Sequence, residues 1–123
     1  MKIILDTHIF LWALSEPDRL TDKHRFELEA LSNIVYVSSI SIAELMIKSS
    51  IGKLKVDFDP IEMVKESGFE LLDFTAKDAF YLKELPFHHK DPFDRMIICQ
   101  GLNNKIKIMT NDSKFESYDC KLV

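Results

Sequence analysis

The chain has 123 residues, and its 46% hydrophobic and 29% charged content indicates one folded globular domain over 1–123 rather than a disordered chain. No apolar run approaches the roughly 20 residues that a membrane helix needs, so we expect no membrane association. The net charge of −4 argues against broad, sequence-independent adhesion to nucleic acid.

Short apolar and β-branched runs predict four strands, at 2–6, 34–37, 69–72 and 106–109, with 121–123 as a candidate fifth. Apolar residues at helical spacing, preceded by capping residues, predict helices over 9–14, 21–31, 38–50, 60–67, 75–85 and 91–103. A short final helix is expected to begin at Asn111 or Asp112. Gly52 and Gly68 follow two of these helices and are typical helix-ending residues.

Three of the helices carry apolar residues that predict how they pack. The helix over 38–50 is apolar almost all round, so we expect it to be largely buried. The packing positions expected in the other two are Phe26, Leu28 and Leu31 in 21–31, and Ala76, Ala79, Phe80 and Leu82 in 75–85.

Strands that alternate with helices predict parallel pairing through right-handed crossovers. We therefore expect an α/β fold, a three-layer sandwich with a central parallel sheet of four to five strands. In such sheets, ligands bind beyond the carboxyl ends of the strands.

The cysteines and the amino-terminal residues indicate a cytoplasmic protein. Cys99 and Cys120 lie in apolar sequence without metal-ligand spacing, so we expect reduced thiols in the core. Asp6 falls where a signal peptide would continue its apolar segment, which favours the same location.

Four acidic residues are placed to meet at the carboxyl edge of the predicted sheet. Asp6 ends the first strand, and Asp112 follows the fourth. Glu44 lies in the helix that leaves the second strand, and Asp94 opens the helix that leads to the fourth. A right-handed wind brings these four carboxylates together although they are far apart in the sequence.

Each acid also has a local alternative, which is helix capping. Asp6 and Asp112 suit the N-cap position of the helices that follow them. Glu44 fits a capping box with Ser41. Asp91, which precedes Pro92 at the first helical position, is either a cap or a further acid of the site.

The expected convergence of four acidic side chains at one sheet edge favours a metal site over helix capping alone. Clustered carboxylates repel one another and are stabilised by divalent cations. All-oxygen ligands without cysteine or paired histidine point to Mg²⁺ or Mn²⁺ rather than zinc. Such ions lower the pKa of a coordinated water and stabilise charge on a leaving oxygen, which suits phosphoryl chemistry.

Residues near the acids have two interpretations each. The hydroxyls of Thr7 and Thr110 would either orient a carboxylate or a metal-coordinated water, or bond to the backbone. Arg95 and Lys90 would either hold a substrate phosphate or remain solvated surface charges.

Three histidines also lie near the acids in the sequence. Their spacing matches no zinc pattern, so we expect no metal ligation by His8, His88 or His89.

Four motifs resemble those of PIN-domain nucleases, most of all the VapC-type toxins of prokaryotic toxin–antitoxin pairs, and the resemblance extends from Met1 to Val123. The motifs are Ile4-Leu5-Asp6-Thr7-His8, Ser41-Ile42-Ala43-Glu44 with Ile47-Lys48 and Gly52-Lys53-Leu54, His89-Lys90-Asp91-Pro92-Phe93-Asp94-Arg95 with Ile97, and Thr110-Asn111-Asp112 with Phe115. The Asp-Pro-Phe-Asp-Arg stretch is the most specific of them.

The resemblance implies a Mg²⁺- or Mn²⁺-dependent endoribonuclease that cleaves RNA. It implies an acidic site of Asp6, Glu44, Asp94 and Asp112, with Asp91 as a further acid frequent in this branch. It also implies a homodimer that is inhibited by a cognate antitoxin, whose tail covers the acidic site.

Two other interpretations stay open at the level of sequence. A phospho-receiver domain has a similar length, but it needs paired acids after the first strand and a lysine after a late strand. Here Asp6 is unpaired, and the late strand ends in Thr110-Asn111-Asp112. A non-catalytic interaction module with the same fold is the second alternative, and the complete set of acids argues against it.

Overall fold

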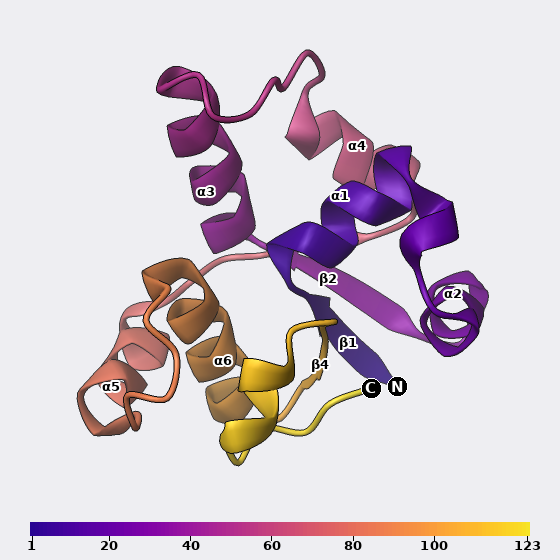
Figure 1. The fold of residues 1–123 in the computed structure, drawn as a ribbon. Coiled ribbons are helices and arrows are strands. Elements are labelled where there is room, and N and C mark those ends of the chain that lie inside the picture. Colours follow the sequence, from indigo (N-terminus) through magenta and orange to yellow (C-terminus); the bar gives the residue numbers. More distant parts are fainter.

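The computed structural model describes residues 1–123 and contains one sheet of four parallel strands in the order β3-β2-β1-β4 (Figure 1). The strands are β1 Lys2–Leu5, β2 Ile34–Ser38, β3 Glu70–Leu72 and β4 Lys107–Met109. Leu5 at the end of β1 lies opposite Val37 of β2 and Met109 of β4, so these strands end at one edge. The candidate fifth strand is reduced to a single bridge between Ile108 and Leu122.

Six α-helices and two 3₁₀ turns connect or flank the strands. Their bounds are α1 Thr7–Ser15, η1 Pro17–Arg19, α2 Asp22–Glu29, α3 Ser39–Ser50, α4 Pro60–Glu66, α5 Ala76–Glu84, α6 Pro92–Asn104 and η2 Ser113–Ser117. Each α-helix begins after a side chain that accepts a hydrogen bond from its first turn, which explains why local sequence located the starts well.

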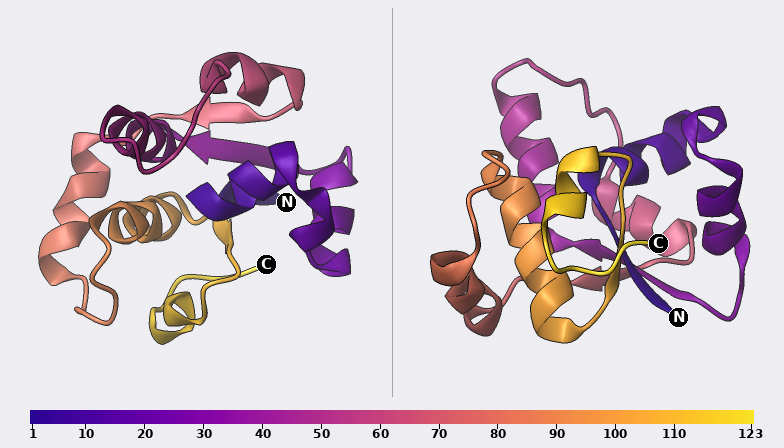
Figure 2. Two further views of the ribbon diagram at one scale, coloured as in Figure 1. Left: turned by 45° about the horizontal axis from the view of Figure 1, so that its top comes forward. Right: turned by 60° about the horizontal axis from the view of Figure 1, so that its bottom comes forward.

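The sheet is the middle layer, because successive side chains of β1 enter separate cores. Ile3 and Leu5 pack with Phe10 of α1 on one face of the sheet. Ile4 packs on the other face with Ile97 of α6. Figures 1 and 2 show α5 and α6 side by side on this second face. The predicted three-layer α/β sandwich with a parallel sheet is therefore confirmed, with four strands.

Two helices turn a different face inward from the one predicted. In α2, His24 is buried and Leu28 one turn later packs on the core, so Phe26 between them points outward and is 69% exposed. In α5 the inward residues are Asp78 and Leu82, which leaves Phe80 81% exposed. The predicted packing roles of Phe26 and Phe80 are wrong.

Leu31, also predicted to pack, lies beyond the end of α2 at Glu29 and is fully exposed.

The helix over 38–50 is not largely buried, contrary to the prediction. In α3 only Ser41, Glu44 and Leu45 are buried, and they share one face at helical spacing. Met46 and Ile47 on the other side are exposed. The buried face is the one that carries Glu44, and α3 therefore presents this acid toward the sheet edge.

Both chain termini lie at the edge of the sheet opposite to the one where α1 and α3 begin (Figures 1 and 2). Neither cysteine is in a disulfide, and burial raises the pKa of both thiols, that of Cys99 to about 11. No helix combines the length and the apolar character that crossing a membrane requires.

Candidate active site

Asp6 follows β1 directly, and Asp112 follows the paired strand β4 after Thr110 and Asn111, at the carboxyl edge of the sheet. Oδ1 of Asp6 accepts the N–H of Ile9 at 2.8 Å, and Oδ1 of Asp112 accepts that of Lys114 at 2.9 Å. Both residues therefore cap helices. Oδ2 of Asp6 instead accepts the hydroxyl of Thr110 at 2.5 Å. In both aspartates, Oδ1 accepts the capping hydrogen bond, and Oδ2 faces the acidic site.

Glu44 is buried on α3, whose N-cap is Ser38 rather than Ser41. The Ser38 hydroxyl accepts the N–H of Ile40 at 3.0 Å, so the predicted capping box of Ser41 and Glu44 is wrong. Oε2 of Glu44 accepts a hydrogen bond from Nζ of Lys48 at 2.6 Å. Oε1 is buried and has no partner within the chain. A buried carboxylate oxygen without a partner is costly, which points to a ligand at this position.

Asp91 and Asp94 have different roles at the start of α6. Asp91 is the N-cap, and its Oδ1 accepts the N–H groups of Phe93 at 2.8 Å and Asp94 at 3.2 Å. Burial raises the pKa of Asp94 to about 8. The negative charges that add to this rise are those of Asp91, Asp6, Glu44 and Asp112. Asp94 is thus within electrostatic reach of the other three carboxylates singled out from the sequence.

Burial also raises the pKa of Asp6, although hydrogen bonds from Thr110 and from the backbone of Ile9 offset part of the rise. Asp6 and Asp94 therefore both resist ionisation in the chain alone. A cation bound among them would remove this resistance, because it favours the charged form of each carboxylate.

His89 joins the acids, although its sequence spacing gave no reason to expect it. The side chain is buried, and its Nε2 lies 2.9 Å from Oδ2 of Asp112 and 3.0 Å from Oδ2 of Asp94. One candidate ligand atom from each of these three residues lies within 4.8 Å of the others. The sequence does place His89 only five residues before Asp94. Whether a histidine at that position points toward the acids depends on the conformation of the loop before α6, which the sequence pattern does not give.

Lys48 also contacts an acid of the site, although the sequence analysis assigned it no role. Its hydrogen bond to Glu44 raises the pKa of the Lys48 ammonium, and the charges of Asp91 and Asp94 act in the same direction. Lys48 lies four residues after Glu44, a spacing that places both side chains on one helix face. That spacing is visible in the sequence and was the available signal.

The hydroxyls predicted to support the site have separate roles. Thr110 orients Asp6, as one of the two interpretations held, and its oxygen also accepts the N–H of Asp112 at 3.0 Å. Thr7 is buried and donates to the hydroxyl of Ser41 at 2.9 Å, which connects α1 to α3. Thr7 therefore joins two elements that carry acids without contacting a carboxylate itself.

Arg95 is not a solvated surface charge, so that interpretation from the sequence is wrong. Its guanidinium is buried and donates to the carbonyl oxygens of Pro86 at 2.9 Å and Leu85 at 3.3 Å. The same group lies 4.4 Å from the centroid of the Phe87 ring. Arg95 thus fixes the loop before α6. Lys90 is exposed and forms no ion pair, as a surface charge would.

A hollow of about 340 Å³ opens beside the acids and is lined by Asp6, His8, Trp12, Arg19, Asn111 and Asp112. The guanidinium of Arg19 lies 4.5 Å from the centroid of the Trp12 ring and forms an ion pair of 3.0 Å with Glu16. The hollow therefore combines carboxylates with an aromatic surface and a cation. Of these groups, a cation suits contact with the phosphates of single-stranded nucleic acid, and an aromatic ring suits stacking on its bases.

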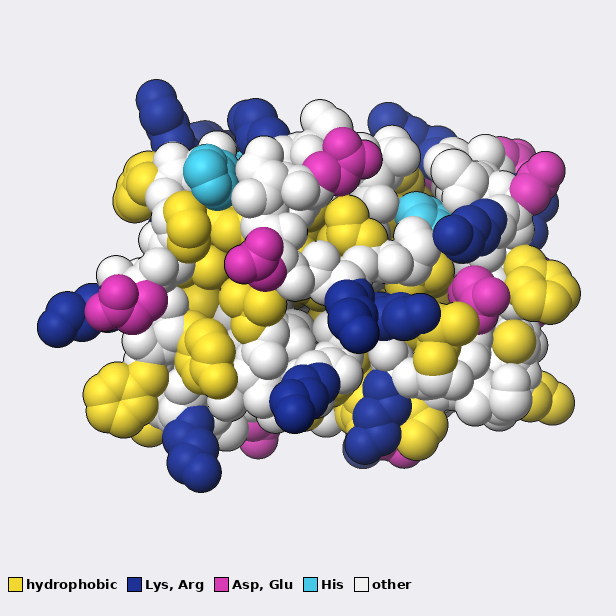
Figure 3. All heavy atoms as spheres, turned by 90° about the horizontal axis from the view of Figure 1, so that it is seen from below, with side chains coloured by type: hydrophobic (Ala, Val, Ile, Leu, Met, Phe, Trp, Pro, Cys, Tyr) yellow, Lys and Arg dark blue, Asp and Glu magenta, His cyan; other side chains and the backbone are white.

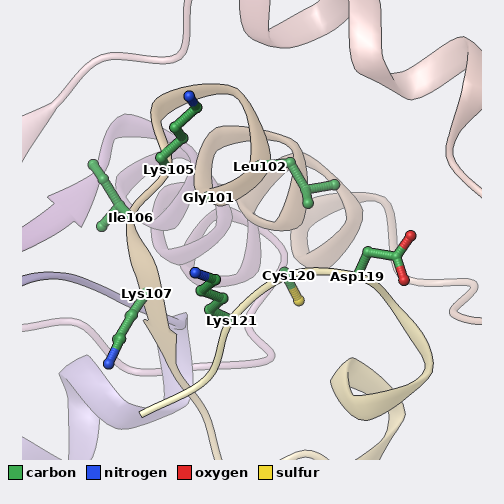
Figure 4. Close-up of a pocket in the computed structure, with 8 residues that line it drawn as sticks. All are labelled: Gly101, Leu102, Lys105, Ile106, Lys107, Asp119, Cys120 and Lys121. Atoms are coloured by element: carbon green, nitrogen blue, oxygen red, sulfur yellow. The ribbon is translucent and has the colours of Figure 1, made fainter.

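A larger cavity of about 420 Å³ lies at the opposite, amino edge of the sheet, where α6 ends and β4 begins (Figure 4). Three lysines line it, Lys105, Lys107 and Lys121. Figure 3 views this side of the molecule and shows Lys and Arg side chains across its middle. Lys105 is the C-cap of α6, with φ of 55°, and a positive charge there offsets the negative end of the helix dipole. This cavity is separate from the acids.

The acid cluster fits a hard divalent cation. Its donors are carboxylate oxygens, which Mg²⁺ and Mn²⁺ prefer. One of them, Oε1 of Glu44, is buried without a partner, and the pKa of Asp94 is raised by burial and by the neighbouring negative charges. The residues that would hold such an ion are Asp6, Asp94, Asp112 and Glu44.

A parallel α/β sheet with carboxylates converging at its carboxyl edge defines this chain as an α/β protein with an acidic site. A model of the PIN domain family matches residues 3–121. The chain therefore belongs to the PIN domain family.

Individual relatives agree with this assignment. The chain is similar to Ribonuclease VapC2 of Rickettsia felis, with 36% identity over 86 residues that cover 69% of this chain and 63% of that protein. The chain thus spans less than two thirds of that curated relative.

Two solved structures resemble the whole fold. A chain in the crystal structure of VapBC2 from Rickettsia felis bound to a DNA fragment from their promoter is 26% identical, with a TM-score of 0.73 and coverage of 99% and 96% of the two chains. A chain in DNA-bound VapBC from Salmonella typhimurium is 20% identical, with a TM-score of 0.70 and the same coverage. The second likeness concerns the fold alone.

Proposed function

We propose that this protein is a Mg²⁺- or Mn²⁺-dependent endoribonuclease. The observation that carries the proposal is the convergence of Asp6, Glu44, Asp94 and Asp112 at one sheet edge, where the pKa of Asp94 reaches about 8. So much negative charge in a half-buried site is stabilised by a divalent cation. The Rickettsia felis relative is a ribonuclease by name, which supports RNA as the substrate.

The residues of the site have distinct roles in this proposal. Asp6, Asp94 and Asp112 hold the cation, and Glu44 helps to hold it or orients the attacking water through Oε1. Thr110 keeps Asp6 in place through its hydroxyl. When bound, the ion lowers the pKa of a coordinated water and stabilises charge on the leaving oxygen.

We further propose that the protein is the toxin of a toxin–antitoxin pair, formed by one PIN-like domain over 1–123 that acts as a homodimer in the cytoplasm. The similarity to VapBC2 at 26% identity over nearly the whole chain supports an antitoxin partner. Expression should arrest growth, and coexpression of the protein encoded beside it should restore growth. Continued growth on expression of the soluble, folded protein would contradict the toxin role.

The site assignment is tested with Asp94→Asn, which keeps the shape of the side chain and removes its charge. RNA cleavage in Mn²⁺ should fall by about two orders of magnitude or more, with the fold intact by circular dichroism. Asp73→Asn, at an exposed position on the connection before α5, is the matched control and should cleave at the wild-type rate. Wild-type cleavage by Asp94→Asn would remove Asp94 from the site. A wild-type protein that bound no Mn²⁺ would favour a non-catalytic PIN-like interaction module.

A further inference from the structure

His89 is held by contacts on every side of its ring. Its backbone N–H donates to the hydroxyl of Tyr118 at 2.8 Å, and its ring meets Phe115 edge to face, with centroids 5.9 Å apart. The His89 side chain is buried, with only 7% of its surface exposed. The imidazole therefore has one orientation, and each ring nitrogen has a defined neighbour.

The neighbours of the two nitrogens fix the tautomer. Nδ1 accepts the backbone N–H of Asp91 at 3.2 Å, so Nδ1 carries a lone pair and not a proton. In the neutral ring the proton then resides on Nε2. Nε2 lies between Oδ2 of Asp112 at 2.9 Å and Oδ2 of Asp94 at 3.0 Å, and both oxygens are acceptors in the ionised carboxylates that a cation would bind. A donor thus faces two acceptors, and the arrangement is complementary.

We propose that His89 is a positioning residue whose Nε2–H holds the facing oxygens of Asp94 and Asp112 together for a divalent cation. The inference rests on the proposed function, because it concerns the same cation site. The two aspartates come from different segments, the start of α6 and the loop after β4, and their charges repel when both carboxyl groups are ionised. A shared N–H donor offsets that repulsion and sets the spacing of the oxygens before the cation binds.

This role differs from direct ligation by His89. A ligand nitrogen needs a free lone pair aimed at the metal, but the nitrogen that faces the acids is the protonated one. Oxygen ligands that accept hydrogen bonds from a surrounding donor are oriented by it, and loss of such a donor typically costs 10-fold to 100-fold in metal affinity. A purely structural role would instead lower stability and leave metal affinity unchanged.

The tautomer is tested in the wild-type protein without metal. Long-range ¹H–¹⁵N correlation spectra should show His89 with the proton on Nε2 and a lone pair on Nδ1. A proton on Nδ1 would overturn the proposal. The Mn²⁺ complex of the wild-type protein provides a second readout, because a ¹⁴N coupling typical of a directly coordinated imidazole would make His89 a ligand instead.

Affinity for Mn²⁺, measured by titration calorimetry, tests the role itself. His89→Phe keeps the ring packing on Phe115 and removes the donor, and it should weaken Mn²⁺ binding about 10-fold to 100-fold. His89→Gln retains an N–H donor and should remain within a few-fold of wild type. The exposed neighbour supplies the matched control, since His88→Phe and His88→Gln should bind as wild type does.

The outcomes separate the two proposals. If His89→Phe folds and binds Mn²⁺ as tightly as wild type, the positioning role is wrong and the proposed cation site stands. If the wild-type protein binds no Mn²⁺, the proposed function fails, and the role of His89 toward a cation fails with it. If His89→Phe does not fold, the affinity of His89→Gln and the wild-type spectra decide.

Discussion

The hydroxyl of Thr110 donates a hydrogen bond of 2.5 Å to Oδ2 of Asp6, although the two residues are 104 positions apart. The bond joins the end of β4 to the end of β1 and offsets part of the rise that burial causes in the pKa of Asp6. It also directs the oxygen that does not cap α1. The placement of Asp6 thus depends on a residue near the other end of the chain.

Replacing Thr110 should weaken metal binding more than it weakens the fold. Thr110→Val removes the donor at nearly constant volume and should lower Mn²⁺ affinity about 10-fold. Its cost in stability should stay near 1 kcal/mol, the usual worth of one hydrogen bond. Calorimetric titration and urea unfolding measure the two effects, with Thr110→Ser as the control that keeps the hydroxyl. Equal Mn²⁺ affinities for the valine and serine variants would contradict the expectation.

Lys48 should stabilise the protein most when metal is absent. Lys48→Met removes the donor to Oε2 of Glu44, and Oε1 has no partner within the chain, so neither oxygen of this buried carboxylate would then have one. The free energy of unfolding in EDTA should fall by about 1–3 kcal/mol. Saturating Mn²⁺ should reduce this deficit, because the ion neutralises Glu44 instead. Lys77→Met, at an exposed position on α5, should unfold as wild type does; a comparable loss there would make the effect nonspecific.

The raised pKa of Asp94 makes the stability of the metal-free protein depend on pH. The folded pKa is about 8, whereas an unfolded aspartate titrates near 3.9, so the folded state holds the extra proton between these values. The contribution of Asp94 is complete below about pH 4 and is lost as the pH rises through about 8. The steepest loss is about 1.4 kcal/mol per pH unit. Asp94→Asn should flatten the profile of urea unfolding between about pH 5 and 8; parallel profiles for both proteins would refute the shift.

Asp78, buried on α5, should matter for stability and not for cleavage. Burial alone would raise its pKa, but hydrogen bonds from Asn103, Thr75 and Asn104 together lower it. Asp78→Ala should therefore cost about 2–4 kcal/mol at neutral pH, and the cost should shrink as the pH falls through the low pKa of the carboxyl. Thermal unfolding of Asp78→Ala against Asp73→Ala checks this prediction. A loss of RNA cleavage in folded Asp78→Ala would show a role in the site.

The sequence was sufficient to locate the four acids because their positions follow from topology. Asp6 and Asp112 each follow a strand, and parallel strands end at one edge whatever the details of packing. Asp91 and Pro92 marked the start of α6 by local capping chemistry, which needs no tertiary information. In the structure, Asp91 is the N-cap of α6, and Asp94 faces the other acids, in agreement with this local pattern.

Residues whose roles depend on loop paths and helix rotation were not predictable in the same way. From the sequence, a surface charge was one interpretation of Arg95, but its guanidinium donates to the carbonyl oxygens of Leu85 and Pro86 in the loop before α6. His89 turns inward because its backbone N–H donates a hydrogen bond to the hydroxyl of Tyr118, which lies 29 residues further along the chain. Phe80 was assigned to the core from apolarity, but the rotation of α5 is set by Asp78 and its asparagine partners.

The bond between Thr110 and Asp6 has a consequence for synthesis of the protein. Translation delivers Asp6 first, and Thr110 is added 104 residues later. A nascent chain that stops before β4 has Asp6, Glu44 and Asp94 but neither Thr110 nor Asp112, so Oδ2 of Asp6 has no donor. The proposed cation site is therefore complete only once Asp112 has been made, and a product truncated before β4 would carry no complete site.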